Sequence, residues 1–191
     1  MLKKKSNASL MMKAVINYMS DNDMNEHKII VIGPSGAGKS YFSKQLAIIT
    51  GLPLYHLDNI FWNEDRTHIT REEFDKKLLE ILEKEEWIID GDYSRTYELR
   101  IKYADTIYFL DFPLEVALAG VESRIGKPRD DIPWNEDIFD PEFKTWIIDW
   151  YKDKLPWVYH LIDKNKDSKT IIVFKTREEM NSYIRALNKS K

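Results

Sequence analysis

The sequence predicts an α/β fold in which one parallel five-stranded sheet is covered by helices on both faces. Five short apolar runs, rich in Ile, Val and Leu, alternate with segments of helical periodicity. Strands that are apolar on both sides are typical of parallel sheets, because helices cover each face. A glycine-rich turn follows the first run, at the sheet edge where such folds bind ligands. The predicted strands are residues 28–32, 52–57, 87–89, 106–110 and 170–174.

The turn after the first strand, Gly33-Pro34-Ser35-Gly36-Ala37-Gly38-Lys39-Ser40, matches the phosphate-loop pattern G-x-x-x-x-G-K-[ST] at every fixed position. The strand at Lys28–Ile32 precedes it, and a helix over Tyr41–Ile49, ended by Gly51, is expected to follow. The pattern is informative only in this strand–loop–helix context. A glycine-rich turn without a ligand is the alternative. The predicted strand before the turn and the predicted helix after it favour a nucleotide-binding site instead.

The residue types of the loop fit the chemistry of a nucleoside triphosphate. Glycines let backbone N–H groups approach phosphate oxygens, and the helix N-terminus adds partial positive charge. Lys39 is expected to reach the β- and γ-phosphates, and Ser40 to hold Mg²⁺. We therefore expect ATP and Mg²⁺ as cofactors, with the nucleotide held by Gly33, Ser35, Gly36, Ala37, Gly38, Lys39, Ser40 and Tyr41.

Helix-start signals place the remaining helices. Thr70 and Glu73 form a capping box, which predicts a helix to about residue 86, and residues 96–103 are expected to be helical. Pro113 suits the first turn of a helix that runs to about residue 125. Asp140 and Pro141 then suit the N-cap and first position of a long aromatic helix, which Pro156 should kink or split. A second capping box, Thr176 and Glu179, predicts the last helix.

A polar loop near residues 126–139, containing Pro128 and Pro133, is a candidate mobile lid. Arg124, Lys127 and Arg129 surround its start, and closing cations stabilise the charge that develops in phosphoryl transfer. A closing loop also excludes water. The alternative is a solvated basic cluster that pairs with the neighbouring Asp130 and Asp131.

Acidic residues follow the predicted strands at the same sheet edge, namely Asp58, Asp90, Asp92 and Asp111. Asp90 is a candidate for ordering a Mg²⁺-bound water, or else a turn-forming residue in Asp-Gly. By strand alternation, Asp58 and His56 should share one face. Asp58 then either accepts a proton from an acceptor hydroxyl or caps the next turn. His56 is interpreted as a structural or pocket-lining residue, and as a pocket-lining residue it is a further candidate for binding the substrate.

Three further residues are candidates for binding a phosphoryl acceptor beside Asp58 and Asp92. They are Trp62, Tyr93 and Arg100. Trp62 could stack on a ring or fill the core, and Arg100 could pair with a phosphate or carboxylate. A plain surface position on a helix is the alternative for Arg100.

Composition sets limits on the class of protein. The 191 residues suffice for one domain, which we place at residues 28–191 after an N-terminal extension, residues 1–27. The net charge of −3 and the lack of a basic stripe make direct nucleic-acid contact unexpected. No apolar stretch reaches the ~20 residues that span a membrane. The absence of Cys excludes disulfides and thiolate sites, and fits a reducing cytoplasm.

These motifs resemble those of the adenylate-kinase-like P-loop kinases and, more narrowly, the group described as DNA topology modulation proteins. The resemblance covers about residues 28–188 and implies a three-layer P-loop NTPase fold with strand order 2-3-1-4-5, a small lid, and adenine packed on Arg124. It lies in Gly33–Ser40, Leu52–Asp58 with Trp62, Trp87–Ser94, Ala104–Asp111, and Glu142-Phe143 with Trp146.

One departure from the family pattern concerns the acceptor. Nucleoside monophosphate kinases typically continue the third-strand Asp-Gly into aromatic-Pro-Arg, whereas this chain continues Asp92-Tyr93-Ser94. The monophosphate-clamping arginine is therefore not at its usual place, although Arg95 or Arg100 could substitute. Asp58 is similar to the acid of shikimate- and gluconate-type kinases, whose acceptors carry hydroxyls.

The sequence thus predicts a phosphotransferase that moves the γ-phosphoryl group of ATP to a small-molecule acceptor, either a nucleotide or a hydroxylated metabolite. Lys39, Asp58, Arg124 and Arg129 are the expected catalytic residues. The alternative is a nucleotide-binding regulatory protein with little turnover, whose partner would contact residues 1–27 or the helix around Trp146. A GTPase is disfavoured because no N-K-x-D pattern is present.

Overall fold

The computed structural model describes residues 27–134 and 136–189, so the predicted N-terminal extension lies outside the described residues except for His27. Five parallel strands form one sheet in the order β2-β3-β1-β4-β5, which confirms the predicted fold class. In the central register, Ile29 pairs with Ile88 on one side and with Thr106 on the other. The strands are β1 (Lys28–Ile32), β2 (Leu54–His56), β3 (Trp87–Asp90), β4 (Thr106–Leu110) and β5 (Thr170–Phe174).

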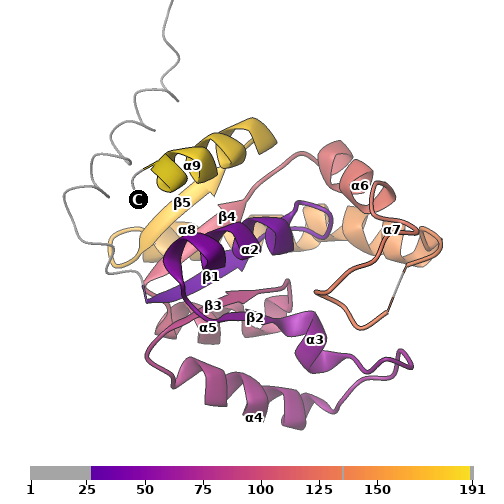
Figure 1. Cartoon of the computed structure of the whole chain (residues 1–191), viewed down its shortest axis with the longest axis horizontal. Helices are drawn as coiled ribbons and strands as arrows, with labels where there is room; N and C mark the ends of the chain where they lie inside the picture. Colours follow the sequence, from indigo (N-terminus) through magenta and orange to yellow (C-terminus); the bar gives the residue numbers. More distant parts are fainter. Residues whose placement is uncertain (1–26, 135, 190–191) are drawn as a thin grey trace, which may run out of the picture.

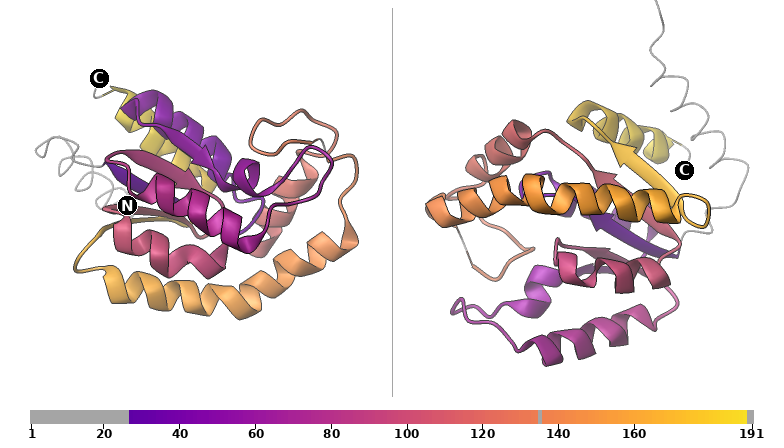
Figure 2. Two further views of the ribbon diagram at one scale, coloured as in Figure 1. Left: turned by 90° about the horizontal axis from the view of Figure 1, so that it is seen from below. Right: turned by 180° about the vertical axis from the view of Figure 1, so that it is seen from behind.

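Helices cover both faces of the sheet, as Figures 1 and 2 show. Side chains of β1 alternate between two apolar layers, and all four from Ile29 to Ile32 are fully buried. Ile29 and Val31 pack with α2 (Lys39–Thr50) and α9 (Arg177–Lys189). Ile30 and Ile32 pack in the layer formed with α4 (Arg71–Leu82), α5 (Tyr97–Tyr103) and α8 (Leu155–Asn165).

The local capping signals are confirmed. The Thr70 hydroxyl accepts a hydrogen bond from the Glu73 N–H at 3.1 Å and begins α4. Asp140 accepts from the Glu142 N–H at 2.8 Å and begins α7 (Pro141–Asp149). The second capping box likewise begins α9, with 3.1 Å between the Thr176 hydroxyl and the Glu179 N–H. These interactions satisfy N–H groups that have no partner inside their helices.

The second strand is shorter than predicted. It ends at His56, and the chain turns at once into α3 (Leu57–Phe61). Asp58 therefore lies in the first turn of a helix, so the predicted common strand face of His56 and Asp58 is wrong. The reason is that β2 pairs only with β3, and β3 ends where His56 lies opposite Asp90. The helix α4 also ends before residue 86, at Leu82, the last apolar residue before β3.

The aromatic helix is divided as predicted, but just ahead of Pro156. Between α7 and α8 lies a π-helical turn, η2 (Trp150–Lys154). Pro156 occupies the first turn of α8, where its missing N–H is tolerated. The turn keeps Trp150 only 3% exposed, facing the core. Another helix, α6 (Leu114–Glu122), begins after Pro113 and ends three residues before the predicted residue 125.

The short helical turn η1 (Ser94–Thr96) joins β3 to α5, and the lid loop, residues 126–139 apart from 135, joins α6 to α7. Throughout the described part of the chain, every helix is too short or too polar to cross a membrane.

Candidate active site

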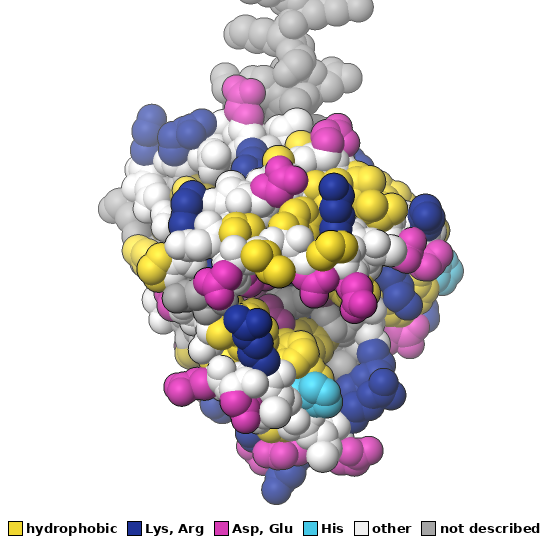
Figure 3. Space-filling view, turned by 90° about the vertical axis from the view of Figure 1, so that its right-hand side faces the viewer, with side chains coloured by type: hydrophobic (Ala, Val, Ile, Leu, Met, Phe, Trp, Pro, Cys, Tyr) yellow, Lys and Arg dark blue, Asp and Glu magenta, His cyan; other side chains and the backbone are white. Residues whose placement is uncertain are grey.

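A cavity of about 1270 Å³ opens at the carboxyl edge of the sheet. The phosphate loop, α3, the β3–α5 connection, the lid loop and α7 supply its walls. Figure 3 looks at the face that carries this opening, where hydrophobic, acidic and basic side chains lie close together. Of the predicted site residues, it is lined by Ser35, Gly36, Gly38, Lys39, Ser40, Tyr41, Asp58, Trp62, Asp92, Tyr93, Arg124 and Arg129.

The phosphate loop depends on glycine at its tip. Gly36 has φ 83°, a conformation that side chains other than glycine rarely adopt. A Cβ atom there would lie 2.0 Å from the carbonyl oxygen of Ala117 in α6. Gly38, with φ 92°, occupies the N-cap of α2, and no side chain caps the first N–H groups of that helix. The remaining predicted loop residues, Gly33 and Ala37, lie beneath the surface of the cavity.

Lys39 lies within this loop at 9% exposure, and its ammonium group donates to the carbonyl of Pro34 at 3.0 Å. Burial lowers the pKa of Lys39, while Asp92, Asp90 and Asp58 oppose that shift in this order of strength. The loop therefore holds a buried cation among three carboxylates. An ammonium in this position can bind phosphate oxygens.

The predicted metal residues fit a hard cation with oxygen ligands. Ser40 lines the cavity. Asp90 is 2% exposed, and its Oδ1 lies 2.7 Å from His56 Nδ1. Its Oδ2 is buried and has no hydrogen-bond partner among the described residues. An unpaired buried carboxylate oxygen is costly, so this atom is suited to a water or an ion at the site.

His56 does not line the cavity. Burial would lower its pKa, but the hydrogen bond and charge of Asp90 raise the pKa of His56 above the usual value. We therefore correct its predicted substrate contact, because its ring is directed to Asp90 at the end of β3. His56 orients the carboxylate that is the metal candidate.

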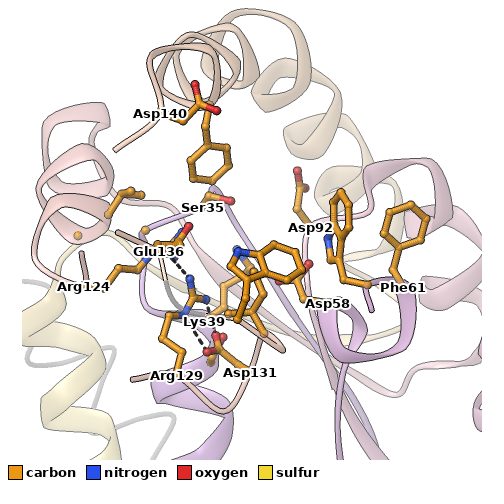
Figure 4. Close-up of a pocket in the computed structure, with 18 of the residues that line it drawn as sticks. Ser35, Lys39, Asp58, Phe61, Asp92, Arg124, Arg129, Asp131, Glu136 and Asp140 are labelled. Atoms are coloured by element: carbon orange, nitrogen blue, oxygen red, sulfur yellow. Dashed lines mark hydrogen bonds and ion pairs between the residues drawn. The ribbon is translucent and has the colours of Figure 1, made fainter. Parts of the chain in front are cut away.

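Two carboxylates face the phosphate loop from the opposite wall, as Figure 4 shows for Asp58 and Asp92. Asp58 Oδ1 accepts from the Tyr93 hydroxyl at 3.0 Å. Burial raises the pKa of Asp58, against the effects of Tyr93 and Lys39. Asp92 Oδ1 accepts from the Tyr97 hydroxyl at 2.6 Å and from Trp150 Nε1 at 3.1 Å.

Aromatic side chains complete this acceptor wall. The Tyr93 backbone has φ 28°, unusual for a side chain of this size, and its ring stacks on Phe74 at 4.8 Å. Trp62 lines the cavity and meets Trp134 of the lid loop edge-on, with ring centroids 5.2 Å apart. The sequence contains no signal for this pair, because loop residues have no periodicity that fixes their partners.

Arg100 lies outside the cavity, so its predicted acceptor contact is corrected. Its side chain is fully buried, and it donates to the carbonyls of Gly91 at 3.1 Å and Asp92 at 2.6 Å. It also donates to the Thr96 hydroxyl at 2.9 Å. Arg100 thus supports the connection that carries Asp92 and Tyr93. Arg100 lies on the same face of α5 as the buried Tyr97 and Ile101. This helical spacing could have indicated that its side chain points inward.

The lid arginines are paired with acids of their own loop. Arg124 Nε lies 2.7 Å from Glu136 Oε2, and Arg129 Nη1 lies 2.5 Å from the same oxygen. Arg129 also binds both oxygens of Asp131, at 3.0 and 2.8 Å. Lys44 of α2 forms an ion pair with Asp130. Of the two predicted pairings, that of the basic cluster with Asp131 is present, whereas Asp130 pairs with Lys44 outside the cluster, and the partner Glu136 was not predicted.

Comparison with known proteins gives partial sequence matches and broader structural ones. No protein-family model matches the sequence. The adenylate kinases of Thermotoga petrophila and Thermotoga maritima are each 33% identical over 94 residues. The matched stretch spans 48% of this chain and 42% of each relative, so the chain matches less than half the length of these curated relatives.

Among solved structures, the shikimate kinase from Acinetobacter baumannii in complex with shikimate superposes with a TM-score of 0.57 at 16% identity. The alignment covers 88% of this chain and 95% of that one. A gluconokinase from Sinorhizobium meliloti gives a TM-score of 0.51 at 14% identity, over 86% and 91% of the two chains. At these identities the likeness concerns the fold. The chain therefore has the fold of the small P-loop kinases.

Proposed function

We propose that this protein is an ATP- and Mg²⁺-dependent kinase that transfers the γ-phosphoryl group to a hydroxyl of a small-molecule acceptor. The observation that carries the proposal is that Lys39 and Ser40 share one cavity with the carboxylates of Asp58 and Asp92. Partly buried carboxylates are costly in free energy. A protein that only senses a nucleotide does not require them opposite its phosphate loop.

The residues around the phosphate loop have separate roles in this proposal. Lys39 binds the β- and γ-phosphates, and Arg124 and Arg129 approach the transferred group from the lid wall. Ser40 and Asp90 hold the metal, directly or through water. When bound, Mg²⁺ neutralises the charge of the phosphates. The lid loop excludes water from the reacting atoms.

Asp58 is the proposed proton acceptor. Its raised pKa lies closer to neutral pH than that of an exposed aspartate, which improves it as a general base. Tyr93 orients the carboxylate through Oδ1. Asp92, held by Tyr97 and Trp150, is placed to bind a second polar group of the acceptor.

We favour a hydroxylated metabolite over a nucleoside monophosphate as acceptor. Arg100 is buried against backbone carbonyls, and Arg95 is engaged by Asp75 at 2.6 and 3.0 Å. Arg100 therefore lies outside the cavity, and Arg95, which lines the cavity, is paired with Asp75 instead of being free for a monophosphate. Membership of the DNA topology modulation group, which rests on motif residues alone, stays a prediction.

The test is a thermal-shift and coupled-ADP screen over sugars, hydroxy acids and nucleoside monophosphates with MgATP present. A true acceptor should raise the melting temperature by mass action and accelerate ADP formation. Lys39→Ala should lose both responses, whereas Asp58→Asn should keep the MgATP response and lose turnover. MgATP binding without turnover across the whole panel would favour the regulatory alternative.

A further inference from the structure

The first turns of α7 carry an aromatic surface that has no role in the proposed function. Phe143 and Trp146 are the two residues through which α7 lines the cavity. Their rings stack, with centroids 5.7 Å apart and planes inclined by 15°. Phe139, at the end of the lid loop, lines the cavity as well and meets Phe143 edge-on at 6.3 Å. These three rings form what we call the α7 aromatic face.

Packing of the core does not account for the α7 aromatic face. The same side of the helix continues into Ile147 and Trp150, which are buried and supply its contact with the core. Trp146, in contrast, is 46% exposed although it lines a cavity. Because Phe143 stacks on one face of its ring, the exposed area is the remainder of the indole. An exposed aromatic surface inside a cavity is typical of a ligand-binding site.

The α7 aromatic face is continuous with the acceptor wall. Trp150, one helical turn beyond Trp146, donates its Nε1–H to Asp92 at 3.1 Å. A second pair of rings, Trp62 after α3 and Trp134 of the lid loop, lines the same cavity with centroids 5.2 Å apart. The carboxylates that are proposed to bind acceptor hydroxyls therefore share their cavity with aromatic rings from two separate parts of the chain.

The chemistry of this lining favours a ligand that contains a planar ring. A polyol or a hydroxy acid would place hydroxyls against the indole, where they lose water without gaining a hydrogen bond. An aromatic ring instead offers a π face that stacks on the indole or meets it edge-on. The cavity of about 1270 Å³ exceeds the ~300–1000 Å³ that is common for one small-molecule ligand, so it has room for ATP and a ring-bearing acceptor.

We propose that the acceptor carries a planar aromatic ring in addition to the hydroxyl that is phosphorylated, and that Trp146 binds this ring. The inference rests on the proposed function and names the substrate class of the same site. Nucleosides and aryl glycosides share the required chemistry, a ring attached to a sugar. In the transfer, the acceptor oxygen bonds to the γ-phosphorus while the bond from that phosphorus to the bridging oxygen of ADP breaks. The hydroxyl proton passes to Asp58.

Matched pairs of acceptors test the substrate class. Phenyl β-glucoside and methyl β-glucoside carry the same free hydroxyls, and so do uridine and methyl β-ribofuranoside. With MgATP, kcat/KM for ADP formation should be about tenfold higher for the ring-bearing member of at least one pair, the size expected from one stacking contact. The pair that responds distinguishes a nucleoside from an aryl glycoside. Equal kcat/KM within both pairs, or a preference for the ringless members, would overturn the proposal.

Substitutions of Trp146 test the residue. Trp146→Ala and Trp146→Leu should raise the KM for the preferred ring-bearing compound about tenfold, with little change in kcat or in the KM for ATP. Trp146→Phe should stay close to the wild type because it keeps a ring. Ile48→Ala is the matched control, since it removes a 74% exposed apolar side chain that lies on α2 outside the cavity lining. A wild-type KM in Trp146→Leu would indicate that only apolar bulk matters and would contradict the proposal.

The remaining outcomes separate this inference from the proposed function. An equal rise in the KM for ATP would assign the α7 aromatic face to the adenine of the donor, and unchanged kinetics in Trp146→Ala would assign it to a protein partner. Either result overturns the inference, as does turnover confined to ringless acceptors, and each leaves the kinase function in place. Absence of turnover with these four compounds and with the wider acceptor screen would remove the kinase function, and the inference with it.

Discussion

The contact between α6 and the phosphate loop allows a sharp test, the substitution Gly120→Ala. The two backbones meet directly at this point. A Cβ atom at Gly120 would lie 2.0 Å from the carbonyl oxygen of Gly36 and 2.7 Å from Arg177 Nη2. The first distance is about 1.4 Å shorter than an ordinary contact, which begins near 3.4 Å. Because the first neighbour is backbone, α6 and the loop must separate to admit a methyl group.

Two opposing effects determine the magnitude. Helix propensity favours Ala over Gly by about 1 kcal/mol. Overpacking of a well-filled site costs about 1–3 kcal/mol, and a clash with backbone belongs at the upper end. We expect a net destabilisation of about 1–2 kcal/mol. Displacement of Gly36 also misdirects the loop N–H groups, so the affinity for MgATP should fall at least about tenfold, which corresponds to ~1.4 kcal/mol.

Urea unfolding and calorimetric titration with MgATP measure the two effects on the same preparation. The matched control is Gly51→Ala at the end of α2, where φ is 80° and no atom lies within 4 Å of the added Cβ. Its left-handed backbone should cost a similar ~1–2 kcal/mol without changing nucleotide affinity. The reasoning is refuted if Gly120→Ala is as stable as the wild type and binds MgATP equally well.

Three further substitutions test the acceptor wall. Asp58→Asn should raise the melting temperature at neutral pH, because burial of the ionised carboxylate raises its pKa and costs stability above that pKa. The difference from the wild type should shrink as the pH falls and Asp58 becomes protonated, and a pH-independent difference would contradict this origin. Tyr93→Phe removes a hydrogen bond that lowers the pKa of Asp58, so the pH profile of turnover should shift to higher pH; an unshifted profile would exclude Asp58 as the base. Arg100→Met removes a buried cation bonded to two carbonyls and should destabilise the protein by about 3 kcal/mol in urea unfolding, whereas a surface role predicts no change.

Local sequence signals predicted most of the fold. The capping residues Thr70, Asp140 and Thr176 act on N–H groups within their own helices, so their function can be read without knowledge of the tertiary structure. The apolar strands were also located correctly. The end of β2 was not, because the run Leu52–Leu57 carries no break before Leu57, whereas the pairing of the strand is limited by its partner β3.

The candidate site was predictable to different degrees on its two sides. The phosphate loop is one continuous motif, and its residues come together through local geometry alone. The acceptor wall depends on contacts between distant segments, such as Trp150 with Asp92 and Trp62 with Trp134. No local pattern encodes these pairs. For Arg100 the periodicity of α5 indicated burial, but its charge favoured a functional interpretation.

The carboxylates on the two walls of the cavity have different hydrogen-bond partners. This difference supports assigning proton transfer to the acceptor wall. On the lid wall, Glu136 and Asp131 are neutralised by arginines. On the acceptor wall, Asp58 is oriented by the neutral hydroxyl of Tyr93. An arginine at that position would lower the pKa of Asp58 and weaken it as a base, whereas a neutral donor fixes its geometry at a smaller cost in basicity. A proton acceptor is therefore expected at Asp58, and the lid carboxylates are suited to binding cations.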